Sequence, residues 1–266
     1  SLRLPPGIIS EGKLLNRNFL LEALKSLRRQ LKVKPKAVFP VVVSLPAASV
    51  FTQSFSVPEI DDEQLKEAAN LNLQMISPIE HLETAYYHWQ KIGLRNHQQN
   101  QIDLLGAFVS RALVDDLYGV LREVGFYPSA FEFPALALAR LFKNFVNTPG
   151  LYIIIQLTSD GLDFMIVQDG NLYFNYFYSW KAVQGENRQI NIGDFQKILT
   201  EEIQKVANFA STHFPQKISG VYIAADSMEK ETGEIIESRF GFKAIALRLA
   251  RFPSLGTGWF GVLGSA

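Results

Sequence analysis

VSLPAASVFTQSFSVPEIDDEQLKEAANLNLQMISPIEHLETAYYHW, residues 43–89, is the stretch of sequence that decides the fold. Apolar and polar residues alternate over Ser49–Val57, which predicts a half-buried strand. The segment 61–64, Asp-Asp-Glu-Gln, resembles a capping box at the start of a helix that runs to about Ile76. Ala85–Ile92 then predicts a second strand. The stretch therefore indicates an α/β unit in the order strand, helix, strand.

Downstream of this stretch, the sequence predicts a returning strand and another helix. The polar segment Asn96–Gln101 is typical of a hairpin loop, and Leu104–Val109 follows it as a strand. The next helix is expected to end before Gly125, because a glycine just past a helix end readily adopts the left-handed conformation. Two further strands, at Val38–Ser44 and Ala130–Phe133, lie on either side of this unit in the sequence.

The sequence pattern changes at Leu151, and the residues that follow predict a second α/β unit. Leu151–Leu157 is a continuous apolar run, as in a strand that lies in the middle of a sheet. Asp169-Gly170 is a strong hairpin signal, since both residues tolerate positive φ. Asp194 is expected to cap a long amphipathic helix. Asn147–Gly150 is the best linker candidate, and a length of 266 residues suits about two units of roughly 150 residues.

Composition and charge exclude several classes of function. Hydrophobic residues make up 47% of the chain and charged residues 20%, which is typical of a globular protein. The 26 basic and 26 acidic residues balance, so we expect no strong non-specific binding to nucleic acid or to an anionic membrane. Because the sequence has no cysteine, it forms no disulfide, thiolate metal site or cysteine nucleophile. Neither a signal peptide nor a membrane-spanning helix is predicted.

Short motifs give little sign of catalysis or of metal binding. The four histidines are scattered, so we expect no zinc pair on a helix and no metal site. The sequence contains no GxSxG elbow, P-loop or GxGxxG motif. The turn 158–161, Thr-Ser-Asp-Gly, is the one hint of phosphate binding, because hydroxyls and exposed amides between two strands can cradle a phosphate. An ordinary tight turn is the alternative interpretation.

Several further motifs, in their order and spacing, resemble the PilM family of actin-like proteins that serve type IV pilus assembly. The chain is more distantly similar to the division protein FtsA and to the cytoplasmic domain of GspL-type proteins of type II secretion. The segments that carry the resemblance are PPGIISEGKLLNRNFLLEALKSLRRQ (5–30), the stretch 43–89, LLGAFVSRALVDDLYGVLREVGFYPSAFEFPALALARLF (104–142) and GWFGVLGSA (258–266).

This resemblance implies an α/β, actin-like fold with an inserted strand–helix–strand–strand subdomain. Residues 46–125 would form the insertion, residues 1–45 and 126–148 the first actin-like half, and residues 149–266 the second half. The first strand or strands of that fold, together with the family's first phosphate loop, would precede Ser1.

The family binds ATP, and the resemblance places its remaining nucleotide contacts in a second phosphate loop, on one helix and in an adenosine motif. The matching residues are Thr158, Ser159, Asp160 and Gly161 in the loop, Glu202 and Lys205 on the helix, and Ala224 and Ala225 in the motif. Gln156 stands where the family has an aspartate for the metal or its waters, and alanines replace a Gly-Gly pair. We therefore expect no catalytic residue and no cofactor, while ATP with Mg²⁺ would require an intact first loop.

The resemblance implies a non-catalytic scaffold, peripheral to the cytoplasmic face of the inner membrane, that contacts pilus or secretion assembly components. Its expected partner is a PilN-like bitopic membrane protein, whose N-terminal peptide would lie between the insertion and the strands Val38–Ser44 and Ala130–Phe133. Tyr86, Tyr87 and Trp89 are candidate contacts, and core packing is the alternative role for these aromatic residues. Two other functions stay open, namely an actin-like nucleotide switch and an FtsA-like filament former.

Overall fold

The computed structural model describes residue 4 and residues 7–10, 12–31, 38–79, 81–96, 100–146, 149–182, 192–248, 256 and 260. The predicted closing segment 258–266 lies outside the described residues except for Phe260. His97 and parts of the predicted loop 96–101 and linker 147–150 also lie outside them. No helix within the described residues is both long enough and apolar enough to cross a membrane.

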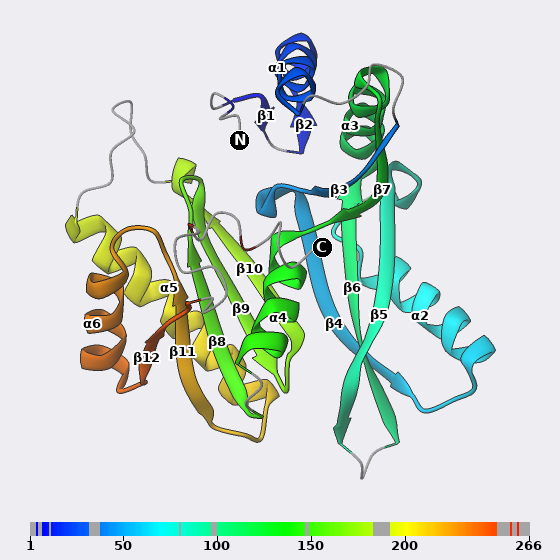
Figure 1. The fold of residues 1–266 in the computed structure, drawn as a ribbon. Helices are drawn as coiled ribbons and strands as arrows, with labels where there is room; N and C mark the ends of the chain where they lie inside the picture. The colour runs from blue at the N-terminus through cyan, green and yellow to red at the C-terminus, as the bar shows by residue number, and fades with distance from the viewer. Residues whose placement is uncertain are drawn as a thin grey trace.

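A five-stranded sheet forms the core of the second half of the chain, on the left of Figure 1. In spatial order its strands are β10 (Asn171–Ser179), β9 (Gly161–Gln168), β8 (Leu151–Leu157), β11 (Ile218–Ala224) and β12 (Ala244–Ala246). β8 pairs with β11 in parallel and with β9 in antiparallel orientation, so it lies in the middle of the sheet. This position explains its largely apolar sequence, in which Gln156 is the polar residue. The predicted hairpin at Asp169-Gly170 is confirmed, with positive φ at both residues.

Three helices cover the two faces of this sheet, namely α4 (Pro134–Phe145), α5 (Ile192–His213) and α6 (Glu229–Phe240). α4 packs on one face, where the ring of Phe142 lies 4.8 Å from the ring of Tyr222. α5 lies on the other face and packs against α6 (Figure 1). Because α5 begins at Ile192, Asp194 occupies its first turn and not the predicted cap position. A carboxylate is favourable in that turn as well, since it faces the positive end of the helix dipole.

The predicted series of strand, helix, hairpin and helix is present as a three-stranded antiparallel sheet with two helices. These elements are β4 (Val50–Pro58), α2 (Asp62–Ile76), β5 (Ala85–Asn96), β6 (Gln101–Ser110) and α3 (Arg111–Val124), and the strand order is β4-β6-β5. As predicted, the side chain of Asp61 caps α2, because it accepts hydrogen bonds from the amides of Glu63 and Gln64 at 3.0 and 2.9 Å. One face of the sheet buries Leu104 of β6 in a cluster with Leu65 of α2.

The first half of the chain contributes a parallel pair of strands, β3 (Phe39–Ser44) and β7 (Phe126–Glu132), with α1 (Arg17–Gln30) and α3 packed beside them. β7 begins earlier than the predicted strand at 130–133. Pro128 interrupts the strand pattern there, but a proline is tolerated in a strand with one paired neighbour. A short hairpin of β1 (Ile9–Ser10) and β2 (Lys13–Leu14) was not predicted, and β2 packs against α3.

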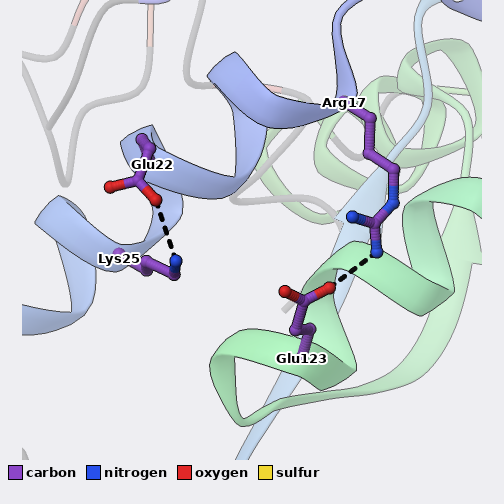
Figure 2. A network of polar contacts seen from close by, with 4 residues as sticks. All are labelled: Arg17, Glu22, Lys25 and Glu123. Carbon is purple, nitrogen blue, oxygen red and sulfur yellow. Dashed lines mark hydrogen bonds and ion pairs between the residues drawn. The ribbon is translucent and has the colours of Figure 1, made fainter.

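Figure 2 shows the polar contacts of α1 with its surroundings. Arg17 forms an ion pair with Glu123 of α3 at 2.6 Å, and within α1 Lys25 pairs with Glu22 at 2.8 Å. All four side chains are largely exposed, so each pair contributes little to stability. Apolar packing between the two helices, which buries Leu20 of α1, accounts for most of their association.

The inserted unit packs against β10 of the large sheet. The hydroxyl of Tyr173 on β10 donates a hydrogen bond to the carbonyl of Ile92 on β5 at 3.3 Å. A Cβ atom at Gly93 would overlap the hydroxyl oxygen of Tyr173, so this position requires a glycine for the close approach. The domain boundaries expected at residues 45, 125 and 148 stay predictions.

Candidate functional site

A groove of about 400 Å³ opens between the three-stranded sheet and the junction of β7 with α4. This volume falls in the range of pockets that bind small ligands or peptide side chains. One side of the groove is formed by the three-stranded sheet, and the other side is formed by the end of β7 and the start of α4. The groove therefore lies at the boundary where the family resemblance placed a peptide.

Alternate residues of the central strand β6 form an apolar floor. Leu105, Ala107 and Val109 line the groove and share one face of β6, because side chains alternate along a strand. Val50 of β4 extends this floor, since it lies opposite Val109 in the strand register. Ala107 has the smallest side chain of the three β6 residues, so a larger side chain at this position would fill part of the groove.

The edge strand β5 forms the outer wall of the groove. Tyr86, His88 and Gln90 lie opposite Val109, Ala107 and Leu105 in register, and so they project from the same face as the floor residues. Among the described residues, β5 pairs with β6 alone. Its second edge is therefore a place where an extended peptide can add a strand.

The opposite wall consists of the end of β7 and the first turn of α4. Phe131, Phe133 and Leu136 supply apolar surface there. Glu132 also lines the groove, and its carboxylate pairs with the guanidinium of Arg140 on α4. The Glu132 side chain is 11% exposed and that of Arg140 is 45% exposed, so the acid is held in the wall while the base lies at the surface.

The structure places the three predicted aromatic contacts at this groove, in different settings. Tyr86 lies on the groove face, donates its hydroxyl to Asp115 Oδ1 at 2.9 Å and carries the Arg111 guanidinium 4.3 Å above its ring. Tyr87 and Trp89 line the groove margin but belong to the opposite face of β5. There the ring of Tyr87 lies 6.3 Å from that of Phe108, and Trp89 packs on the cluster beneath α2.

The turn 158–161 forms hydrogen bonds within itself. The hydroxyl of Thr158 accepts hydrogen bonds from the amides of Asp160 and Gly161 at 3.3 and 3.2 Å. Ser159 donates its hydroxyl to the Asp160 side chain at 3.2 Å, and the Trp180 indole donates to the Thr158 carbonyl at 3.0 Å. The amides of Asp160 and Gly161 are therefore engaged within the turn.

The other residues matched to nucleotide contacts lie at the same sheet or on the helix behind it. Ala224 is the last residue of β11 and pairs in register with Gln156 of β8, and Ala225 follows directly after the strand. Both alanines are buried. On α5, the buried Glu202 binds Lys205 at 2.7 Å, and this hydrogen bond raises the pKa of the Lys205 ammonium. The carboxylate of Glu202 is thus already paired with a base of its own helix.

The groove floor and Glu132 were not predicted as site residues. The run Leu104–Val109 is apolar on both faces, because Leu104 faces α2 while Leu105 faces the groove. No alternation therefore marks the floor in the sequence. Glu132 and Arg140 both lie in the segment 104–142 that carries the family resemblance, where they were matched as motif positions and not as site residues.

Comparison with known proteins supports the fold. No protein-family model and no curated protein matches the sequence. The solved structure of a PilM–PilN type IV pilus biogenesis complex matches over 98% of this chain and 88% of that chain, with a TM-score of 0.76 and 13% identity. The expected actin-like fold of the PilM type is confirmed by this match.

Two other solved structures match this chain with lower TM-scores. A Bacteroides thetaiotaomicron protein with an actin-like ATPase fold matches over 92% of this chain and 80% of that one, at 12% identity and a TM-score of 0.45. The cytoplasmic domain of EpsL, an inner membrane component of the type II secretion system of Vibrio cholerae, matches over 77% and 66%, at 13% identity and a TM-score of 0.39.

Proposed function

We propose that this chain is a non-catalytic scaffold protein that holds the N-terminal peptide of a PilN-like bitopic membrane protein in the groove between β5 and β7. It would act at the cytoplasmic face of the inner membrane, as part of a type IV pilus or type II secretion assembly platform. The observation that carries the proposal is the apolar groove beside a free strand edge. The fold shared with a protein solved in a complex with PilN supports it.

The groove offers an extended peptide both affinity and selectivity. Main-chain hydrogen bonds to the edge of β5 would hold the peptide, and alternate side chains would enter the groove. Burial of one leucine-sized side chain above Ala107 would contribute roughly 1.5–3 kcal/mol. Ordering of the peptide opposes this gain, so we expect an affinity in the micromolar range.

The proposal includes no nucleotide chemistry. The Thr158 hydroxyl engages the turn amides, and Gln156 places an uncharged, buried side chain before the turn. Both features weaken the case for a bound phosphate and its metal. In this proposal, the residues matched to nucleotide contacts stabilise the second half of the fold.

Calorimetric titration tests the proposal directly. The probe is a synthetic peptide with the cytoplasmic N-terminal sequence of the PilN-like protein from the same organism. Ala107→Leu adds a larger side chain to the floor of the groove and should weaken peptide binding about tenfold or more. Ala246→Leu is the matched control, since Ala246 is an exposed strand alanine on β12 of the other sheet. Its peptide affinity should equal that of the wild type.

Two results would contradict this account. Peptide binding that is equally tight in the wild type and in Ala107→Leu would remove the groove from the function. A second titration with Mg-ATP should give no heat, and saturable ATP binding would make a nucleotide switch the better description.

A further inference from the structure

Glu132 is exceptional among the described residues that line the groove. The lining is otherwise apolar, aromatic or uncharged, with His88 and Gln90 as the polar members of the outer wall. Glu132 alone in that lining carries a carboxylate. A charge in an apolar wall favours partners of complementary charge.

The bonding of Glu132 leaves one acceptor available. Its Oε2 atom pairs with Arg140, and its backbone carbonyl accepts a hydrogen bond from the amide of Leu45 at 2.7 Å. Among the described residues, Oε1 has no bonded partner. A peptide that covered the groove would remove water from this oxygen, and a buried carboxylate oxygen without a donor is unfavourable.

We propose that Glu132 selects the docked segment by binding a cationic group of it, either a Lys or Arg side chain or a free α-amino group. This inference rests on the proposed function, because it assumes that a segment docks in the groove. Cytoplasmic segments next to a membrane span are rich in Lys and Arg, so a bitopic partner supplies this chemistry. The cation would lie at the β7 side of the groove, with apolar side chains over Ala107 and Leu105.

Arg140 acts as the competitor of that cation. It lies on α4, outside the groove lining, and its side chain is far more exposed than that of Glu132. Because the Arg140 side chain is 45% exposed, its guanidinium can return to water when it leaves the carboxylate, while the incoming cation keeps the largely buried Glu132 paired. The exchange keeps Glu132 neutralised in both the free and the docked state. A segment without a cation would leave Arg140 in place and would gain no new charge pair.

The test uses the same N-terminal peptide in several forms, titrated against the wild-type chain, Glu132→Gln and Arg140→Gln. In both sets, every native Lys or Arg of the peptide is replaced by Gln. Each peptide of the first set has an acetylated N-terminus and one Lys, placed at each position in turn. The peptides of the second set have no Lys or Arg, and their N-terminus is either free or acetylated. We expect one Lys position, or the free terminus, to raise wild-type affinity about fivefold over the neutral acetylated peptide.

The variants separate recognition of a charge from a structural role. Glu132→Gln should abolish the preference while still binding the neutral peptide, and Arg140→Gln should enlarge the preference. High salt should reduce the wild-type preference, because it screens the pair. The comparison of the free with the acetylated terminus identifies the source of the cation.

Failure of the inference and failure of the proposed function give different results. If all peptides bind the wild type and Glu132→Gln alike, yet binding is lost in Ala107→Leu, the charge selection is wrong and groove docking stands. If no peptide binds the wild type, groove docking is wrong, and the selection by Glu132 is wrong with it.

Discussion

The hydroxyl of Tyr86 donates a hydrogen bond to Oδ1 of Asp115 at 2.9 Å, and this contact joins the edge strand of the groove to α3. Arg111 reinforces the junction, because its Nε donates to the carbonyl of Glu83 at 3.0 Å while its guanidinium covers the Tyr86 ring. The outer wall of the groove is therefore fixed by residues at the start of α3.

Tyr86→Phe should lower the free energy of unfolding by about 0.5–1 kcal/mol, since it removes one partly exposed hydrogen bond and keeps the ring. Urea denaturation measures this change. The control is Tyr118→Phe, because Tyr118 of α3 is equally exposed and also lies beside an arginine, at 5.7 Å. Equal losses in the two variants would show that the Tyr86–Asp115 bond does not stabilise the wall.

The turn after β8 is predicted to be rigid. A Cβ atom at Gly161 would overlap the backbone oxygen of Tyr178 on the neighbouring strand, and backbone cannot move aside easily. Gly161→Ala should therefore cost about 2 kcal/mol or more. Gly119→Ala in α3 is the control, since a Cβ there meets open space and should stabilise the helix by about 0.5–1 kcal/mol. A neutral Gly161→Ala would mean that the turn can open, and ATP binding would deserve renewed testing.

The contact of Gly93 with Tyr173 predicts an energetic link between the insertion and the large sheet. Gly93→Ala should destabilise the protein, because the new methyl group overlaps the buried hydroxyl of Tyr173. Tyr173→Phe removes that oxygen and should relieve part of the cost, with a coupling energy of about 1–2 kcal/mol in a double-mutant cycle. Additive effects of the two substitutions would indicate that the two subdomains shift apart freely at this point.

Local signals in the sequence predicted most of the secondary structure. The Asp61 cap, the apolar run of β8 and the Asp169-Gly170 turn each depend on interactions within a few residues, and all three are present. The buried stripe of α2 follows Leu65, Ala69 and Leu73 at four-residue spacing, and Met75 lies off this stripe with 83% of its surface exposed.

The groove depends on contacts between distant parts of the chain. The family resemblance placed a peptide between the insertion and the strands Val38–Ser44 and Ala130–Phe133, but it did not identify the floor residues of β6 that line the groove. The turn at Thr158 is a second feature that the sequence alone could not specify. The sequence left two interpretations of this turn open, a phosphate cradle and an ordinary tight turn, and it does not specify that the hydroxyl would bind the amides of its own turn.

Asp163 makes the stability of the large sheet depend on pH. It lies on β9 opposite Gln156, is buried, and accepts a hydrogen bond at Oδ1 from the side-chain amide of Asn175. Within the described residues its Oδ2 atom has no partner. Burial raises the pKa of this carboxyl from 3.8 to about 7, and the Asn175 bond offsets part of that increase.

The sign of the effect follows from proton binding. Between about pH 4 and pH 7 the folded protein holds a proton on Asp163 that the unfolded chain has released, so the free energy of unfolding falls as the pH rises. Above about pH 7 the Asp163 carboxyl is ionised in both the folded and the unfolded state, so the loss of stability no longer changes with pH. Asp163→Asn removes the charge and keeps an acceptor for Asn175. Its gain in stability over the wild type should grow by roughly 2–3 kcal/mol from pH 5 to pH 8.

Urea denaturation at pH 5 and pH 8 measures this difference, and the exposed Asp160→Asn in the nearby turn is the control for general charge effects. Asp160→Asn should change the free energy of unfolding by the same amount at pH 5 and at pH 8. If Asp163→Asn gave the same gain at both pH values, the carboxyl would titrate at an ordinary pKa in the folded protein. Water or a cation would then have to reach Oδ2, and the end of β8 would be more open than its packing implies.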